Sequence, residues 1–216
     1  MSGRLGAAIA EFLSAHADKE FAPKRRELLR HARGRVLEVG AGTGFNVRHY
    51  PDTVTELVLT EPRGALLERA RRRGEETGRP FRAVQARAEA LPFEDASFDT
   101  VVSTLVLCSV ANQDEALAEI RRVLKPDGTF LFIEHVRADD PKAARWQDRL
   151  ERPWRVVAMG CHPNRATLDR IEAAGFDLDA LDRGALPKSP PIVRPMITGS
   201  AHLRTVASKA RPETAS

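Results

Sequence analysis

Residues 36–44, with the sequence VLEVGAGTG, decide the fold. A short apolar run of this kind predicts a buried β-strand, and it leads directly into a turn in which every second residue is glycine. Glycine lets the backbone pass close beneath a ligand, where the Cβ of another residue would clash. The segment therefore predicts a strand, a ligand-binding turn and a following helix, which is the first unit of an open α/β sheet.

Two carboxylates accompany this turn. Glu38 lies at the end of the strand before the first glycine, and Glu61 ends the next predicted strand. A carboxylate about twenty residues beyond the glycines can accept hydrogen bonds from both hydroxyl groups of a ribose. The third predicted strand ends in ARAEALPF, residues 86–93. Together these features strengthen the prediction of a ligand site, which a glycine triplet alone would leave weak.

A nicotinamide dinucleotide site is the competing interpretation of the turn. That site has the pattern G-x-G-x-x-G and places a pyrophosphate on a helix N-terminus. Here the spacing is G-x-G-x-G, and Glu38 would repel an anionic pyrophosphate. The same carboxylate suits a ligand that carries an ammonium and a sulfonium group.

Strand and helix patterns alternate along most of the chain. The alternation predicts βαβ units and a parallel, doubly wound sheet of the α/β class. The expected strands are 35–40, 57–61, 81–86, 97–104 and 129–134, and the expected helices are 18–32, 63–77 and 114–124. Residues 125–128, KPDG, predict a turn between the last of these helices and the fifth strand.

The pattern changes after His135. Residues 140–163 carry both tryptophans and predict an irregular helical insertion. A helix is expected at 164–174, with Asn164 as its N-cap and Gly175 beyond its end, followed by strands at 176–181 and 195–202. The expected organisation is an N-terminal extension and candidate lid at 1–17, a single domain at 18–203 and a flexible tail at 204–216.

Composition excludes several classes of function. The 216 residues are 42% hydrophobic, and 34 basic residues face 30 acidic ones for a net charge of +4. Such mixed charge is typical of a solvated surface. The arginine-rich stretch 69–73 lies on a helical pattern whose apolar positions are Leu66, Leu67 and Ala70, with few aromatic residues for base stacking. We therefore expect no nucleic-acid partner.

The cysteines and the N-terminus bear on the cellular compartment. Cys108 and Cys161 form neither a disulfide framework nor a zinc-ligand spacing, and the histidines are scattered, so no metal site is expected. Residues 1–12 are too short and too charged to span a bilayer and lack a signal-peptide core. The sequence thus predicts a cytoplasmic protein with no stable membrane anchor.

At this point the residues resemble class I S-adenosylmethionine-dependent methyltransferases. Within that class, several segments are similar to the animal alkyl thiol methyltransferases and their bacterial relatives: LVLCSV at 105–110, FIEHV at 132–136, GC at 160–161 and VRP at 193–195. The resemblance extends from about residue 18 to about residue 202. It implies a Rossmann-like, seven-stranded sheet that is mostly parallel with an antiparallel last strand and has helices on both faces.

The resemblance also implies where S-adenosylmethionine binds. The glycine turn backs the methionine moiety, Glu61 takes the ribose, Ala88 and Glu89 flank the adenine, and Thr104 and Leu105 lie beside the methyl-bearing sulfur. The expected cofactor-binding residues are Glu38, Gly40, Ala41, Gly42, Gly44, Glu61, Pro62, Ala88, Glu89, Thr104 and Leu105. Many relatives have aspartate where Arg87 stands, which leaves the adenine contact to Glu89 or to the backbone.

The implied activity is methylation of a small molecule, with the sulfur of a thiol as the first candidate acceptor. An O- or N-methyltransferase of a metabolite, quinone or lipid head group stays open, because the glycine turn and the ribose carboxylate are the same in both. A nucleoside-binding module without catalysis is the alternative from another class. The oligomeric state stays open as well.

Two histidines are candidate catalytic residues. His135 follows the fifth strand at its carboxyl end, on the ligand side of a doubly wound sheet, and its ordinary pKa near 6.5 suits a general base. A histidine that is hydrogen-bonded beneath the pocket is the alternative. His162, beside Cys161, is the second candidate. Glu134 is expected to point away from His135, because neighbours on a strand alternate between faces.

Overall fold

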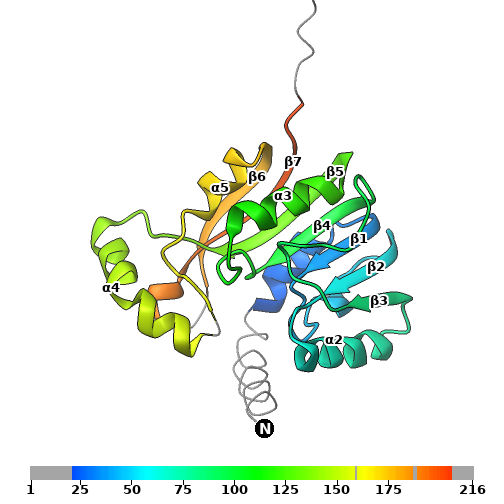
Figure 1. The fold of residues 1–216 in the computed structure, drawn as a ribbon, viewed down its shortest axis with the longest axis horizontal. Coiled ribbons are helices and arrows are strands. Elements are labelled where there is room, and N and C mark those ends of the chain that lie inside the picture. The colour runs from blue at the N-terminus through cyan, green and yellow to red at the C-terminus, as the bar shows by residue number, and fades with distance from the viewer. Residues whose placement is uncertain (1–20, 159, 187–188, 206–216) are drawn as a thin grey trace, which may run out of the picture.

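The computed structural model describes residues 21–205 except 159, 187 and 188. Its centre is a seven-stranded sheet in the order β3-β2-β1-β4-β5-β7-β6 (Figure 1). The strands are β1 Gly34–Val39, β2 Val54–Thr60, β3 Phe81–Val84, β4 Phe98–Thr104, β5 Leu124–His135, β6 Phe176–Ala185 and β7 Pro195–Leu203.

The pairing of the strands confirms the expected fold class. Strands β1 to β5 pair in parallel, whereas β7 is antiparallel to both of its neighbours, β5 and β6. The helices are α2 Gly64–Glu76, α3 Gln113–Val123, α4 Pro141–Val157 and α5 Thr167–Ala173, with short 3-10 turns η1 Val47–His49 and η2 Pro191–Val193. Residues 21–29 are also helical. The sheet is mostly parallel with an antiparallel last strand, as predicted.

Apolar side chains on the two faces of the sheet build two cores. Because side chains alternate along a strand, Leu37 of β1 packs on one face and Val36 on the other. The first face is covered by α3 and α5, which contribute Leu117, Ile120 and Ile171 among others. The second is covered by the 21–29 helix and α2. Both faces are therefore closed, as a largely parallel sheet requires.

The helices begin where the sequence supplies a cap. The side chain of Asn112 accepts hydrogen bonds from the backbone N–H groups of Asp114 and Glu115 at the start of α3. Asp140 does the same for Ala143 at the start of α4, whose first residue is Pro141. Capped amphipathic segments of this kind form helices without depending on their propensity alone.

Helix α4 lies on the opposite side of the molecule from α2, beyond β6 and β7 (Figure 1). It lies within the helical insertion expected at 140–163, and it is more regular than expected, because one capped 17-residue helix runs through Pro153. Within the described part of the chain, no helix is both long and apolar enough to cross a bilayer.

Two predictions at element boundaries were wrong. The turn expected at 125–128 lies inside β5, where a register shift opposite β4 accommodates the extra residues as a bulge. The helix expected from Asn164 starts only at Thr167, with Ala166 as its N-cap. Asn164 instead donates its amide N–H to Asp148 of α4, so a tertiary partner competes with the capping role.

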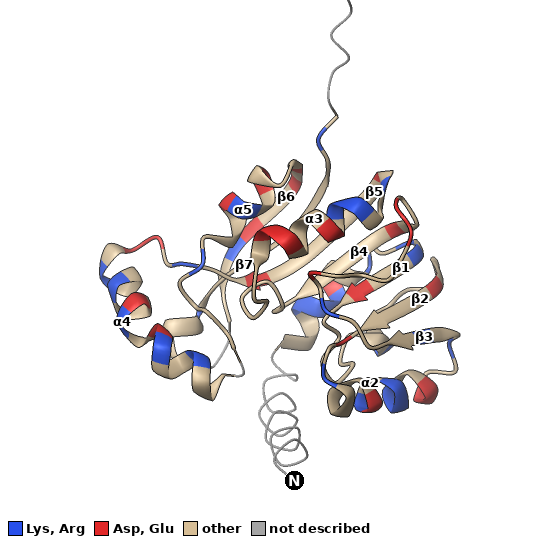
Figure 2. Ribbon diagram, viewed as in Figure 1, with Lys and Arg blue, Asp and Glu red and all other residues tan. Residues whose placement is uncertain are grey.

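The expected lid at 1–17, the first residues of the 18–32 helix and most of the tail at 204–216 lie outside the described residues. Charges of both signs are distributed over α2 and α4 (Figure 2). In α2, Glu68 pairs with Arg72, so the arginine-rich stretch is interleaved with acidic partners.

Candidate active site

The glycine turn joins β1 to η1, and its three glycines have different neighbours. All three have positive φ angles, of 61° at Gly40, 56° at Gly42 and 82° at Gly44. A Cβ on Gly40 would lie 2.7 Å from the side chain of Val106, and one on Gly44 would lie 2.8 Å from Cα of Ala70 in α2. A Cβ on Gly42 would meet nothing within 4 Å. Gly40 and Gly44 thus allow Val106 and Ala70 to pack closely against the turn, whereas Gly42 faces open space.

Glu38 is the centre of a buried hydrogen-bond network. Its Oε1 accepts from the amide of Asn46 at 2.9 Å, and its Oε2 accepts from the hydroxyl of Tyr50 at 2.8 Å. The side-chain amide N–H of Asn46 also donates to Oγ1 of Thr104 at 3.1 Å, and the side-chain oxygen Oδ1 of Asn46 accepts from Arg25 at 2.6 Å. Burial raises the pKa of Glu38 to about 7, against the lowering effect of Tyr50, Arg25 and Asn46. The network links the carboxyl ends of β1 and β4.

Glu61 closes the glycine turn from the end of β2. Its two oxygens accept hydrogen bonds from the backbone N–H groups of Gly42 and Arg63, each at 3.1 Å. Burial raises its pKa, while those two backbone donors lower it. Ala41 is held to β2 as well, because its N–H donates to the carbonyl of Thr60 at 2.8 Å. The carboxylate therefore lies directly against the open glycine.

The residues expected around the adenine lie in the turn after β3. Ala88 is buried in the core, and Glu89 is mostly buried beside it. Oε1 of Glu89 accepts from the backbone N–H of Ala111 at 2.7 Å, just before α3. Hydrogen bonds with backbone groups and with Arg87 lower the pKa of Glu89 below its ordinary value, although burial opposes them. In the structure, Glu89 therefore joins this turn to the start of α3.

Pro62 lies beside the same edge and has a backbone role. Its carbonyl accepts from the Gln85 amide at 2.9 Å, which ties the end of β2 to the end of β3.

Leu105 occupies a strained position at the end of β4. It is one of two non-glycine residues in the described chain with positive φ, at 59°, and its N–H donates to the carbonyl of Ile133 at 2.7 Å. Buried Glu134 supports the segment, since its Oε1 accepts from Ser103 Oγ at 2.6 Å and from the Val106 N–H at 3.1 Å. Strain held in place by a buried carboxylate is typical of functional turns.

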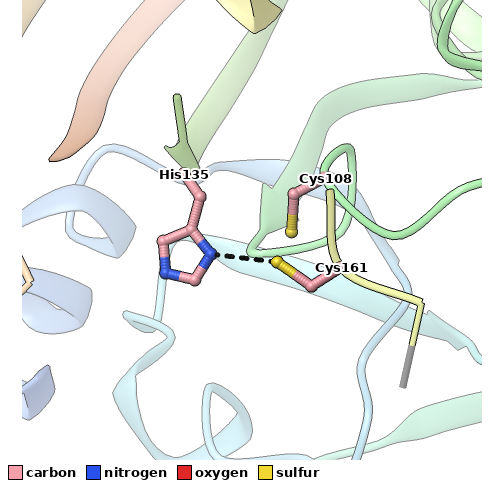
Figure 3. A group of neighbouring side chains, drawn as sticks. All are labelled: Cys108, His135 and Cys161. Atoms are coloured by element: carbon pink, nitrogen blue, oxygen red, sulfur yellow. Dashed lines mark hydrogen bonds between the residues drawn. The ribbon is translucent and has the colours of Figure 1, made fainter. Parts of the chain in front are cut away.

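Cys108, His135 and Cys161 form a buried cluster beside this turn (Figure 3). Their ligand-type atoms all lie within 4.8 Å of one another, and Cys161 Sγ is 3.6 Å from His135 Nδ1. The Cys108 thiol donates to the carbonyl of Leu105 at 3.6 Å. Val193, with Trp154, Ala158 and Ile192, forms an apolar surround for the two sulfurs.

The two thiols of the cluster have different acidities. The neighbouring Cys108 thiol and the His135 ring lower the pKa of Cys161 to about 5, although burial opposes this. The same Cys161 neighbour and burial raise the pKa of Cys108 well above its ordinary value. One sulfur of the pair is thus favoured as a thiolate and the other as a thiol.

His162 lies near the cluster but has a different partner. Its Nδ1 is 2.7 Å from Oε1 of Glu151 in α4, and its backbone N–H donates to the carbonyl of Cys108 at 2.7 Å. Burial lowers its pKa, reinforced by Arg165 and opposed by Glu151. Its imidazole is thus paired with α4, whereas His135 Nε2 is buried with no hydrogen-bond partner among the described residues.

Sequence reasoning missed residues that support the site. Asn46 and Tyr50, which hold Glu38, and Glu134, which holds the turn after β4, received no binding role. A polar residue just after a glycine turn is the signal that points to Asn46, whereas Tyr50 has none in sequence. The structure also gathers three residues with ligand-type side chains from separate segments, which their spacing in the sequence did not predict.

The residues present fit S-adenosylmethionine. Two buried carboxylates, Glu38 and Glu61, lie at adjacent strand ends, and carboxylates are suited to a cationic amino acid and to ribose hydroxyl groups. Gly42 leaves its side of the turn open, so a ligand can approach the backbone there. The two carboxylates would repel the pyrophosphate of an anionic dinucleotide.

Comparison with known proteins agrees with this assignment. Residues 37–132 match the family model described as a methyltransferase domain. The chain is 35% identical over 195 residues to thiol S-methyltransferase TMT1A of Homo sapiens, covering 85% of this chain and 80% of that protein. It is 32% identical over 163 residues to the ubiquinone/menaquinone biosynthesis C-methyltransferase UbiE of Bordetella avium, covering 66% and 64%.

Solved structures share the fold at low sequence identity. The crystal structure of the YcgJ protein of Bacillus subtilis superposes with a TM-score of 0.64 at 19% identity, covering 88% of this chain and 99% of that one. S-adenosylmethionine is accordingly the cofactor, and the chain belongs to the class I S-adenosylmethionine-dependent methyltransferase family that includes the thiol S-methyltransferases.

Proposed function

We propose that the protein transfers a methyl group from S-adenosylmethionine to the sulfur of a small thiol. The observation that carries this proposal is the position of the cluster of Cys108, His135 and Cys161. It lies at the end of β5, next to the turn at Thr104 and Leu105 where we place the methyl-bearing sulfur. The similarity to a thiol S-methyltransferase over most of both chains supports the same acceptor.

The bound cofactor supplies a methyl group on a good leaving group. The protein's task is then to align the acceptor in line with that methyl group, to exclude water and to ionise the acceptor. A free thiol with a pKa of about 8.5 is only a few per cent ionised at neutral pH. Complete ionisation would therefore raise the reactive fraction by roughly 30-fold, and a positioned general base typically contributes on the order of 10²- to 10⁴-fold in rate.

His135 is the residue that we propose for ionising the acceptor. It is buried at the carboxyl end of β5, and its Nε2 has no hydrogen-bond partner among the described residues. His162 suits the role less well, because Glu151 already accepts from its Nδ1. Glu38 and Glu61 are proposed to hold the ammonium group and the ribose of the cofactor, with Gly40, Ala41, Gly42 and Gly44 backing the methionine moiety.

The remaining proposed cofactor contacts lie on both sides of this centre. Ala88 and Glu89 flank the adenine, Pro62 lies at the ribose end, and Thr104 and Leu105 face the sulfonium. The paired Asn46–Thr104 hydrogen bond supports this placement, because it brings β4 to the Glu38 network.

Methylation of a quinone or another metabolite at oxygen, nitrogen or carbon is the second candidate. The similarity to UbiE, which its name describes as a C-methyltransferase of quinone biosynthesis, favours it. The glycine turn and the ribose carboxylate serve both reactions, so only the acceptor separates them.

A steady-state assay with matched acceptors tests the proposal. Purified protein and S-adenosylmethionine are offered thiophenol, phenol and aniline, which differ only in the acceptor atom, and a hydroquinone. S-adenosylhomocysteine release and product mass are measured. We expect the thiomethyl product, with kcat/KM for thiophenol at least 100-fold above phenol. Methylation of the hydroquinone, phenol or aniline alone would overturn the thiol assignment and leave the cofactor assignment in place.

A further inference from the structure

We propose that Cys108, His135 and Cys161 bind one Zn²⁺ ion through three protein ligands, and that the fourth position takes the sulfur of the acceptor. This inference deepens the proposed function and rests on it for the identity of the fourth ligand. The metal site itself is argued from the cluster alone.

The spacing of the three ligand atoms is close to that of a tetrahedral zinc site. Bond lengths of about 2.3 Å for Zn–S and about 2.0 Å for Zn–N give tetrahedral edges of about 3.6 Å from sulfur to nitrogen and about 3.8 Å between sulfurs. Cys161 Sγ and His135 Nδ1 are 3.6 Å apart, and no pair in the cluster exceeds 4.8 Å. A side-chain shift of about 1 Å or less therefore closes the three ligands around an ion.

The three side chains are also oriented toward one another. Figure 3 shows Cys108, His135 and Cys161 converging from separate segments, with Nδ1 of the imidazole facing the sulfurs. Nε2 is buried and unpartnered among the described residues, so no protein acceptor there requires one particular tautomer. With the proton on Nε2, the lone pair of Nδ1 faces the sulfurs, as a metal ligand requires.

Burial and charge also favour a metal ion at the cluster. All three residues are less than a tenth exposed, and the sulfurs are surrounded by apolar side chains. Burying two thiolates in such surroundings without a counter-charge costs free energy, whereas one divalent cation neutralises both negative charges. Soft sulfur and imidazole ligands in a tetrahedral arrangement are the set that Zn²⁺ prefers, and hard cations are disfavoured.

Three protein ligands also indicate the kind of site. Structural zinc sites are filled by four protein ligands, whereas catalytic sites keep one position for water or substrate. No fourth His, Cys, Asp or Glu joins this group among the described residues. Cys108 places the site beside the turn at Leu105, because its thiol reaches the Leu105 carbonyl at 3.6 Å.

The chemistry of such a site matches a thiol acceptor. The acceptor R–SH loses its proton to solvent when its sulfur binds Zn²⁺, since coordination strongly favours the thiolate. A lone pair of that sulfur forms the new S–CH₃ bond, the methyl–sulfonium bond breaks, and its electron pair stays on the departing sulfur. The products are R–S–CH₃, neutral S-adenosylhomocysteine and one proton. His135 would then serve the ionisation proposed above as a ligand of the ion through Nδ1, rather than by taking the acceptor's proton itself.

Cobalt titration tests the site without S-adenosylmethionine or an acceptor. The reduced, chelator-treated full chain is titrated with Co²⁺, and thiolate-to-cobalt charge transfer and tetrahedral d–d absorption are recorded. We expect one equivalent to bind, and displacement by one equivalent of Zn²⁺. The variants C108S, C161S and H135Q should each lose the spectrum or weaken binding at least 100-fold. Circular dichroism verifies that each variant is folded.

The control variant is His202→Gln, which removes a histidine from β7 that is paired with Asp179. It should bind Co²⁺ as the unmodified protein does. A spectrum without charge transfer, or one that is unchanged in C108S and C161S, overturns the site. The site is also overturned if Cys108 and Cys161 of the chelator-treated protein form a disulfide, and the protein binds no metal after that disulfide is reduced.

Further readouts separate this inference from the proposed function. Adding thiophenol to the Co²⁺ protein should change the d–d absorption, and no change overturns the acceptor position. If metal removal leaves thiol methylation intact, the inference fails and the proposed function stands. If Co²⁺ binds with the expected spectrum but no thiol is methylated, the proposed function fails and the metal site stands. We expect chelation to lower kcat/KM at least 100-fold, with recovery on adding one equivalent of Zn²⁺.

Discussion

Glu38 is a carboxylate held inside the protein by neutral partners. Tyr50 and Asn46 donate to its two oxygens, and the side chain is 2% exposed. These donors do not fully replace water, so the pKa of Glu38 rises from its ordinary value of 4.5 to about 7. Its charge at neutral pH therefore depends on what binds next to it.

The raised pKa predicts how Glu38 affects stability. Because the folded state holds the proton more tightly, the contribution is fully present below pH 4.5 and is lost as pH rises through 7. Two and a half pKa units correspond to about 3 kcal/mol. Without cofactor, the free energy of unfolding of the unmodified protein should therefore fall by about that amount relative to E38Q between pH 4.5 and pH 8. Urea denaturation at several pH values measures it, and parallel curves would contradict the assignment.

Cofactor binding should depend on pH through the same group. The ammonium and sulfonium groups of S-adenosylmethionine favour the ionised form of Glu38, so affinity should rise roughly tenfold from pH 6 to pH 8. E38Q has no carboxylate to ionise. It should bind S-adenosylmethionine more weakly at pH 8 than the unmodified protein does, with an affinity that does not change between pH 6 and pH 8. Titration calorimetry checks both. If the affinity of the unmodified protein for S-adenosylmethionine does not change with pH, Glu38 does not contact the cofactor.

Two glycines of the turn should respond differently to the same substitution. Gly44→Ala adds a methyl group 2.8 Å from Cα of Ala70 at a φ of 82°, so it should lower the free energy of unfolding by roughly 3 kcal/mol. Gly42→Ala enters open space and should cost only about 1 kcal/mol in stability, but it should weaken S-adenosylmethionine binding at least tenfold. Chemical denaturation and calorimetry on the pair measure this. Equal cofactor affinity in Gly42→Ala and the unmodified protein would contradict the open-side assignment.

At the scale of elements, a buried glutamine side chain of α4 ties this helix to the rest of the fold. Gln147 is 1% exposed; its amide donates to the carbonyls of Val136 and Ile192, and its oxygen accepts from the N–H of Ala138. The chain then returns from α4 to the cluster at Cys161. By fixing α4, Gln147 therefore helps to position Cys161 without contacting it directly.

Gln147→Ala should destabilise the protein by roughly 3 kcal/mol, because it leaves three backbone groups without partners. Faster hydrogen exchange should follow in α4 and around Cys161, and less so in the central strands. The matched control is the neighbouring Trp146→Ala, since Trp146 is 56% exposed and should change stability by less than about 1 kcal/mol. Exchange that increases uniformly over the whole sheet would show that Gln147 has no local role.

Most elements were predictable from the sequence for a simple reason. The strands are apolar runs and α3 is a capped amphipathic segment, so local pattern and tertiary burial agree in both cases. The prediction failed where a tertiary contact overrides the local signal. Pro126 and Gly128 are typical turn residues but lie in a bulge of β5, and Asn164 bonds to Asp148 instead of capping α5.

The arrangement of the proposed cofactor residues was more predictable than that of the proposed acceptor residues. Glu38 and Glu61 lie in or after strands that flank one short glycine motif, so sequence spacing predicts that they are near it. Cys108, His135 and Cys161 come from three distant segments and share no spacing, so only the folded sheet shows that they meet. The partners of Glu38 were missed for the same reason.

At the scale of the whole molecule, the strand order brings the groups proposed to bind ligands to one edge. With β1 flanked by β2 and β4, and β5 next to β4, the carboxyl ends that carry Glu38, Glu61, Thr104 and His135 lie side by side. Ligands of open α/β sheets bind at this edge, where the strand order reverses. Cofactor binding should therefore stabilise the sheet as a unit.

The cofactor should raise the melting temperature of the whole domain. At 100 times its Kd, S-adenosylmethionine adds about 2.7 kcal/mol, or roughly 5–10 °C for a domain of this size. Glu61→Gln should lose most of that shift at the same concentration. Glu56→Gln is the control, because Glu56 is on the same strand but pairs with Arg35 at the surface. Equal shifts in both variants, measured by scanning fluorimetry, would exclude Glu61 from the cofactor site.

The central claim is that sulfur is the atom that receives the methyl group, and an acceptor with two nucleophiles tests it within one molecule. 2-Mercaptoethanol carries a thiol and a hydroxyl group on the same short chain, so access to the site is equal for both. After incubation with S-adenosylmethionine labelled in its methyl group, fragmentation mass spectrometry locates the label. The account predicts label on sulfur alone. Label on oxygen would contradict it.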